Sequence, residues 1–218
     1  MAGILAISTL FLAFIVSLIF LRYHHRKFLG RNAPRSGENI IAFGDSLIKG
    51  VGASPGKDFI SLLAKKIRRP IINVGHSGDT TASALKRLRK DVLTQNPRIV
   101  IILFGGNDIR NGIPRKVTFH NLALMIDKIR EHGSAILLLG IRGGILIDYF
   151  RWYFWQLAKE KDIPFVPDVY SGIFIEPDLK YDFLHPNNEG YKLIAERVAP
   201  TLKELVRAYY PIKNESHT

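Results

Sequence analysis

A serine, a histidine and an aspartate in this chain stand where they could cooperate in nucleophilic catalysis. Ser46 belongs to the turn Gly44-Asp45-Ser46-Leu47, which directly follows the apolar run at residues 40–43. Asp182 precedes His185 by three residues, a spacing that can place a carboxylate beside an imidazole nitrogen on one side of a turn. A histidine oriented in this way can act as general base toward a serine hydroxyl, which is a poor nucleophile by itself.

Two further polar turns contain groups that could stabilise a negatively charged intermediate. Residues 73–80, Asn-Val-Gly-His-Ser-Gly-Asp-Thr, form a Gly-rich stretch whose backbone amides could donate to an anion. The turn Gly105-Gly106-Asn107-Asp108 adds a side-chain amide donor. Taken singly, each turn also fits an ordinary capping or tight-turn role. Together with the first three residues they supply a nucleophile, oxyanion donors, a base and an orienting acid.

Short apolar runs alternate with amphipathic stretches through residues 39–210, a pattern typical of a mainly parallel sheet covered by helices. We expect strands at residues 40–43, 71–74, 99–104, 135–140 and 164–166. We expect helices at residues 59–67, 82–93, 119–131, 149–161 and 189–208. The carboxyl ends of parallel strands border the ligand-binding crevice, so the polar turns that follow the first three strands should meet at one edge.

With these blocks in order, the chain resembles the SGNH hydrolases, also called the GDSL esterase/lipase family. It is most similar to their acyl-CoA thioesterase I, lysophospholipase L1 and arylesterase branch. The resemblance covers about residues 39–208 and rests on residues 44–47, Asn73 with 77–80, 106–108, and Asp182 with His185-Pro186. It implies a flavodoxin-like three-layer α/β/α sandwich with a parallel five-stranded sheet. Ile48 stands where a G-x-S-x-G elbow would have glycine, which argues against an ordinary α/β-hydrolase.

The resemblance also implies a role for each site residue. Ser46 would be the nucleophile, His185 the general base and then acid, and Asp182 the residue that orients His185. The backbone amides of Ser46 and Gly78 and the side chain of Asn107 would form the oxyanion hole. The implied reaction is the cleavage of an acyl ester or thioester through an acyl-enzyme, without a metal or a cofactor.

Three other aspartates, Asp45, Asp79 and Asp108, adjoin these site residues. We interpret them as carboxylates that brace the loops, because a second acid close to the nucleophile would oppose the developing oxyanion. A metal cluster with His76 or His185 is the alternative, but the spacing matches no recognised metal site. The chain has no cysteine, which excludes disulfides, a thiolate nucleophile and cysteine-ligated metals.

The amino terminus is a different kind of element. Residues 2–21 carry no charge, and a helix of twenty residues spans about 30 Å of hydrocarbon. We predict a retained transmembrane anchor at residues 1–22. A cleaved signal peptide is the alternative, disfavoured because no basic residue precedes the segment and no A-x-A-like site precedes Arg22. A basic juxtamembrane linker at 23–38, the hydrolase domain at 39–210 and a flexible tail at 211–218 would follow.

The formal net charge of +12 bears on partners and location. Residues 1–38 carry five basic and one acidic side chain, so the remainder keeps +8, with basic runs such as 86–90 interpreted as solvated helix faces. No recognised nucleic-acid motif accompanies them, so we expect attraction to an acidic membrane surface and no nucleic acid partner. Basic residues after Leu21 favour the cytoplasmic side, although related proteins are often periplasmic or secreted. We predict a single-pass protein of a bacterial inner membrane.

One stretch, residues 143–155, bears on the substrate. Its apolar and aromatic side chains would surround a whole helix, and it contains both tryptophans, Trp152 and Trp155. We expect part of it to line an acyl pocket or to enter the membrane interface, with packing against the sheet as the alternative. The substrate would then be a lipid-like or aryl ester. An O-acetyl esterase acting on envelope carbohydrate and a non-catalytic anchored binding protein stay open.

Overall fold

A computed structural model describes residues 2–142 and 149–210, with side chains for residues 14–142 and 150–210. The chain divides into two compact units, Met1–Ala33 and Pro34–Thr218. The first unit holds α1 (Ala2–Arg31), which continues as helix through much of the predicted linker. No helix in the described part of the chain is long and apolar enough to cross a membrane. Side chains 2–13 of the expected span and the tail at 211–218 lie outside the described residues, so both stay predictions.

The second unit is built on a five-stranded sheet in which all neighbouring strands are parallel. Its strands are β1 (Asn39–Gly44), β2 (Ile72–Gly75), β3 (Pro97–Leu103), β4 (Ala135–Leu139) and β5 (Phe165–Val166). They lie in the order β2-β1-β3-β4-β5, which is the flavodoxin-like arrangement. The predicted α/β fold with a parallel five-stranded sheet is therefore confirmed, and each strand is within two residues of its expected bounds.

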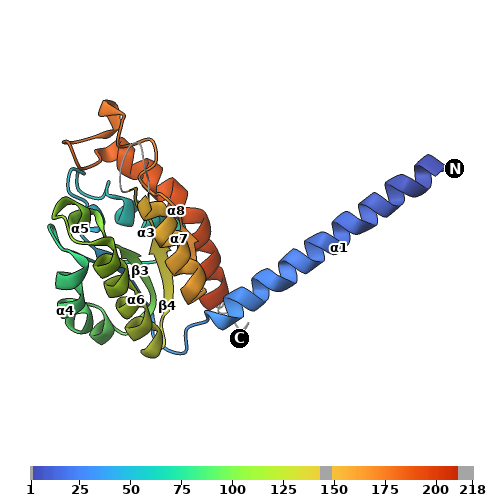
Figure 1. Cartoon of the computed structure of the whole chain (residues 1–218), viewed down its shortest axis with the longest axis horizontal. Coiled ribbons are helices and arrows are strands. Elements are labelled where there is room, and N and C mark those ends of the chain that lie inside the picture. The colour runs from blue at the N-terminus through green and yellow to red at the C-terminus, as the bar shows by residue number, and fades with distance from the viewer. Residues whose placement is uncertain (1, 143–148, 211–218) are drawn as a thin grey trace, which may run out of the picture. The chain divides into compact units, whose positions relative to one another are not determined.

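Helices cover both faces of the sheet. On one face α3 (Phe59–Ile67) packs against α8 (Asn188–Tyr209). On the other, α6 (Arg115–Glu131) packs against both α4 (Thr81–Asp91) and α7 (Tyr149–Lys161) (Figure 1). The chain runs from β1 to β2 in one direction and from β2 to β3, β4 and β5 in the other, so right-handed connections place α3 on one face and α4, α6 and α7 on the opposite face.

The register of the central strands places the polar turns together. Gly44 at the end of β1 pairs with Gly75 of β2 on one side and with Leu103 of β3 on the other. β1, β3 and β4 are almost completely buried, which matches their continuous apolar sequences. The turns after β1, β2 and β3 therefore leave the sheet at one level, at the switch point between β1 and β3 where α/β sheets bind ligands.

Two short helices at this edge were not expected from the sequence. α2 (Ser46–Lys49) follows β1, and α5 (Gly106–Arg110) follows β3. Each is too short to show a helical period, and its residues therefore suggested only a turn. The short helices η1 (Leu93–Gln95) and η2 (Pro177–Leu179) complete the described elements.

Candidate active site

Ser46 is the first residue of α2, on a sharp turn out of β1. The carboxylate of Asp45 caps the helix by accepting the Leu47 backbone N–H at 3.0 Å. A side chain at Gly44 would meet the Ile48 side chain at 2.1 Å and the Leu103 carbonyl oxygen at 2.6 Å, so only glycine allows the strand to turn here. The tight turn holds the Ser46 hydroxyl at the carboxyl edge of the sheet.

His185 reaches Ser46 from a loop 139 residues further along the chain. Its Nε2 lies 3.0 Å from the Ser46 Oγ. Its Nδ1 lies 2.8 Å from Oδ2 and 3.0 Å from Oδ1 of Asp182. The three side chains therefore form a continuous hydrogen-bonded row. An ionised Asp182 favours the His185 tautomer that carries the proton on Nδ1, which leaves Nε2 free to accept from the Ser46 hydroxyl.

Asp182 is itself held by the backbone of the same turn. Its Oδ1 accepts the N–H groups of Leu184 and His185, each at 2.7 Å. The hydrogen bond from the His185 side chain, assisted by these backbone donors, lowers the pKa of Asp182 to about 2. Beyond the turn, Asn187 caps α8 by accepting the N–H groups of Glu189 and Gly190. The aspartate is thus ionised and oriented over the whole neutral range.

The loop that carries His185 is fastened to the neighbourhood of α2. The Tyr191 hydroxyl donates to the Val51 carbonyl at 2.7 Å, just beyond the end of α2. The Tyr170 hydroxyl donates to the Leu184 carbonyl at 2.6 Å. At Gly52, a side chain would meet the Pro186 carbonyl oxygen at 2.5 Å. Tyrosine hydroxyls and a close backbone approach therefore hold the Asp182–His185 turn near the serine.

Asn107 contacts both the Gly78–Asp79 turn and the Ser46 turn. Asn107 is 7% exposed, and its Nδ2 donates to the Asp79 carbonyl oxygen at 2.8 Å. The same nitrogen lies 3.5 Å from Oδ2 of Asp45, the residue before Ser46. Gly78 has a φ of +85° and no atom within 4 Å of where a side chain would start, so its turn is open. The Asn107 side chain thus lies between the Gly78–Asp79 turn and the Ser46 turn.

A model of the GDSL-like lipase/acylhydrolase family matches residues 42–193. The chain belongs to this family. An arylesterase of Vibrio mimicus is 32% identical over 181 residues, 78% of this chain and 90% of that protein. The thioesterase 1/protease 1/lysophospholipase L1 of Escherichia coli is 28% identical over 179 residues, 78% of this chain and 86% of that protein.

A solved structure agrees with these sequence relatives. The psychrotrophic esterase EstA from Pseudoalteromonas sp., inhibited by monoethylphosphonate, matches with a TM-score of 0.70 and 25% identity, over 77% of this chain and 98% of that one. The predicted resemblance is confirmed, and the chain is an enzyme of the SGNH/GDSL esterase kind.

The three further aspartates of this GDSL hydrolase hold loops, as interpreted from the sequence. Asp108 is fully buried and accepts the Thr81 backbone N–H at 3.0 Å and the Thr81 hydroxyl at 2.5 Å. Asp45 is 3% exposed, and burial raises its pKa to about 6. Among the side chains at 14–142 and 150–210, no cluster of histidine and acidic residues is arranged to hold a metal.

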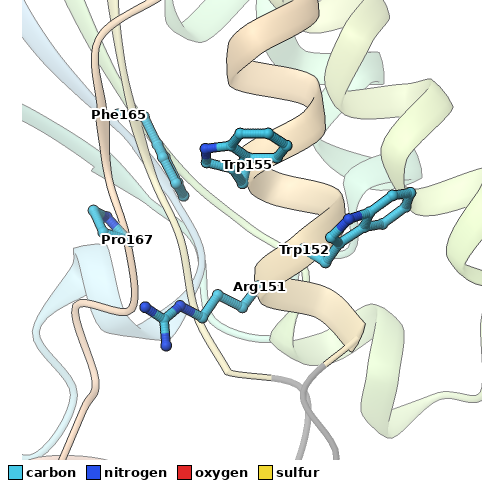
Figure 2. Close-up of a pocket in the computed structure, with 5 residues that line it drawn as sticks. All are labelled: Arg151, Trp152, Trp155, Phe165 and Pro167. Atoms are coloured by element: carbon cyan, nitrogen blue, oxygen red, sulfur yellow. The ribbon is translucent and has the colours of Figure 1, made fainter.

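Trp152 and Trp155 line a pocket of about 410 Å³ with Arg151, Phe165 and Pro167. Figure 2 shows Trp155 of α7 and Phe165 of β5 on opposite sides of it, with the Arg151 side chain extending toward Pro167. The two indoles are 53% and 49% exposed, and residues 143–148 of the predicted stretch lie outside the described residues.

The inner side of α7 explains the rest of its apolar sequence. Phe150 and Phe154 are buried, and both rings contact Phe119 of α6. The helix therefore packs against α6 through one side, and its two tryptophans are partly exposed on another side. Since β5 and β1 are separated by β3 and β4, strand spacing puts the pocket roughly 14 Å across the sheet from the serine strand. The structure thus does not place the tryptophans beside the triad.

Arg87 is the site residue that the sequence interpretation missed. The basic run at 86–90 was expected to be a solvated face, but the Arg87 side chain is only 12% exposed. Its spacing from Ala84 and Leu88, both buried on α4, places it toward the sheet. That helical spacing was the available signal, and the charged neighbours of Arg87 in the sequence concealed it.

Proposed function

We propose that the chain is a serine hydrolase that cleaves acyl esters or thioesters through an acyl-enzyme intermediate. The observation that carries this proposal is the row Ser46–His185–Asp182, with 3.0 Å between Oγ and Nε2 and 2.8 Å between Nδ1 and Oδ2. This is the relation between nucleophile, base and orienting acid that serine hydrolysis requires.

In the first half of the reaction, Ser46 Oγ attacks the carbonyl carbon and His185 Nε2 takes the hydroxyl proton. The carbonyl oxygen becomes an oxyanion, which accepts from the amides of Ser46 and Gly78 and from the side chain of Asn107. When the intermediate collapses, the C–O or C–S bond breaks and His185 returns its proton to the leaving alcohol or thiol. An acyl group stays bonded to Ser46.

In the second half, His185 takes a proton from water, and the resulting hydroxide attacks the acyl carbon. The second oxyanion collapses by breaking the bond to Ser46 Oγ, and His185 returns the proton to that oxygen. The products are a carboxylic acid and the free serine. Asp182 stays ionised throughout and stabilises the imidazolium that forms in each half, so it orients the base without exchanging a proton.

The favoured substrate is an ester or thioester with an apolar acyl or aryl group. The relatives named arylesterase and thioesterase 1/protease 1/lysophospholipase L1 support this class. The pocket formed by Trp152, Trp155 and Phe165 supports it as well, because aromatic walls suit hydrocarbon rather than sugar hydroxyls. We assign this pocket to the far end of an acyl chain, since an extended chain of about twelve carbons would be needed to span roughly 14 Å.

The test is ester hydrolysis by the full chain and its Ser46→Ala variant, using p-nitrophenyl esters from acetate to palmitate. We expect the wild type to turn over ester and the variant to lose at least about 10³-fold in kcat. Fluorophosphonate should label only the wild type. A preference for acetate would favour the O-acetyl esterase instead. If wild type and variant both hydrolyse ester only at the background rate and neither is labelled, the proposal is contradicted, and the chain would be an anchored binding protein.

We also propose that residues 1–22 anchor the enzyme in a bacterial inner membrane, with the catalytic unit on the cytoplasmic side. Support comes from the uncharged sequence at 2–21 and from the basic residues Arg22, Arg26 and Lys27 that follow it. An anchored hydrolase would meet lipid-like esters at the membrane surface, which fits an apolar acyl pocket.

A further inference from the structure

The guanidinium of Arg87 joins strands and loops that are far apart in the sequence. Nη2 donates to the Gly44 carbonyl at 3.0 Å, and Nη1 donates to the Val74 carbonyl at 2.8 Å. Nε donates to Asp79 Oδ2 at 2.5 Å, and Nη1 also reaches Asp91 Oδ2 at 3.1 Å. All three nitrogens are therefore engaged.

Two of these partners adjoin the candidate oxyanion hole. Gly44 ends β1, two residues before Ser46, and Asp79 directly follows Gly78. The backbone carbonyl of Asp79 in turn accepts Nδ2 of Asn107 at 2.8 Å. One side chain thus contacts the first two loops directly and reaches the third through Asp79.

We call Arg87 and its hydrogen-bond partners the clamp. The ring of Phe43 and the hydroxyl of Ser83 also contact it. The Arg87 guanidinium carbon lies 4.6 Å from the centroid of the Phe43 ring, on the β1 side. Oδ1 of Asp79 accepts the Ser83 hydroxyl at 2.8 Å. Both oxygens of the Asp79 carboxylate therefore bond to α4, and its negative charge is paired with Arg87.

We propose that Arg87 is a positioning residue that sets the Gly78–Asp79 turn and Asn107 against the Ser46 turn. The inference rests on the proposed function for its catalytic consequence, because oxyanion donors stabilise the transition state only when they are already in place. A planar guanidinium can donate in three directions at fixed angles. A lysine ammonium keeps the charge but cannot reach both strand carbonyls and the carboxylate in this geometry.

The decisive variant is Arg87→Lys, compared with Arg98→Lys as a matched control. Arg98 is also half-buried, and it donates to the Tyr209 carbonyl at 2.6 Å and the Gly37 carbonyl at 2.9 Å. It stands near the start of β3, at the opposite edge of the sheet from the site. The two variants therefore remove similar arginine–carbonyl contacts, and only one of them supports the donor loops.

In the full chain we expect Arg87→Lys to lower kcat by about 10-fold to 100-fold on p-nitrophenyl butyrate, with KM changed less than about threefold. Arg98→Lys should keep kcat within about twofold. A loss only of structural stability would instead lower the yield of active enzyme equally in both variants. Wild-type kcat in Arg87→Lys, or the same loss in both variants, would overturn the proposal.

Amide hydrogen exchange of residues 75–80 provides a readout that does not need turnover. We expect faster exchange there in Arg87→Lys than in the wild type, and no change in Arg98→Lys. Faster exchange in Arg87→Lys alone supports the clamp even if the wild type hydrolyses no ester, an outcome that would contradict only the proposed function. Unchanged exchange in Arg87→Lys would overturn the clamp.

Discussion

Asp182 and Asp45 are both aspartates of the site, yet their surroundings move their pKa values in opposite directions. The partly exposed Asp182 is bonded by His185 and two backbone N–H groups, which lower its pKa to about 2. Because this pKa is depressed, ionised Asp182 favours the fold above about pH 4, and that contribution disappears as the pH falls through about 2. The acid that orients the base therefore keeps its charge at every pH well above 2.

Asp45 behaves in the opposite way, because burial raises its pKa from 3.8 to about 6. The hydrogen bond from the Leu47 backbone N–H and the neighbouring His185 oppose this rise, and the charges of Asp79 and Asp108 add to it. The folded state holds the Asp45 proton more tightly than the unfolded state does, so protonation of Asp45 stabilises the fold. This stabilisation is complete below pH 3.8 and is lost as the pH rises through 6. The shift of about two pKa units corresponds to about 3 kcal/mol, nearly half of it lost between pH 5 and pH 8.

Replacing Asp45 with asparagine should remove this pH dependence. Asn keeps an oxygen for the Leu47 N–H but does not titrate. We expect the wild-type free energy of unfolding to fall between pH 5 and pH 8 by about 1 kcal/mol more than that of Asp45→Asn. Urea unfolding at both pH values measures the difference. Asp58→Asn, at the cap of α3, is the control and should keep the wild-type profile. Parallel profiles for wild type and Asp45→Asn would contradict the prediction.

At the scale of elements, Asp108 joins α5, which carries Asn107, to the first turn of α4. It accepts from Thr81 through both the backbone N–H and the hydroxyl, inside a fully buried contact. We expect Asp108→Asn to lower the free energy of unfolding by about 2 kcal/mol, because an amide nitrogen would then face a buried donor. Urea unfolding at pH 7 measures this loss.

The control for this variant is Asp127→Asn on α6. Asp127 pairs with Lys161 of α7 at 2.7 Å, but the aspartate side chain is 41% exposed. A pair with this exposure stabilises by less than about 1 kcal/mol. Equal losses of stability in the two variants would contradict the prediction, because the buried contact between α4 and α5 would then stabilise no more than the exposed pair.

The tryptophans of α7 should affect how the enzyme selects the length of the acyl chain. Replacing Trp152 and Trp155 together with serine should lower kcat/KM for the palmitate ester by about 10-fold or more and leave acetate unchanged, because only the long chain would reach the pocket. The control is Val117→Ser, which removes an apolar side chain that is 43% exposed on α6. Equal loss on both esters would contradict the assignment of the pocket to acyl chains.

The division of the whole molecule into two units indicates that membrane attachment and ester hydrolysis can be separated. Pro34–Thr218 contains the sheet and every proposed site residue. Deleting residues 2–21 should therefore move the enzyme from the membrane fraction to the soluble fraction, while ester hydrolysis per mole changes less than about twofold. Fractionation of cells followed by the butyrate assay checks both. An undeleted chain found in the soluble fraction would contradict the anchor.

The side of the membrane has its own test, which the absence of cysteine makes simple. Lys203 is exposed on α8, so Lys203→Cys introduces a single accessible thiol. We expect a membrane-impermeant thiol reagent to label it in broken cells but not in intact ones, because basic flanks favour the cytoplasm. Labelling of intact cells would place the catalytic unit on the other side.

The strands, the longer helices and the chemistry at the strand ends could be recognised from the sequence alone. Continuous apolar runs predicted β1, β3 and β4, because a strand buried on both faces needs them. Glycine and polar residues after the strands predicted Ser46, Gly78 and Asn107 at one edge. These signals are local: a strand, a turn or a cap depends on residues within a few positions, so each can be recognised before the chain is folded.

Which of these parts come into contact depends on the packing of the folded chain. The bond between Ser46 and His185 spans 139 residues, and the inward position of Arg87 and the distance of Trp155 from β1 depend on how α4 and α7 pack. The same is true of the pKa of Asp45, which rises because other segments exclude water from it. Contact and desolvation are properties of the packed chain, since they arise from residues that the sequence keeps far apart.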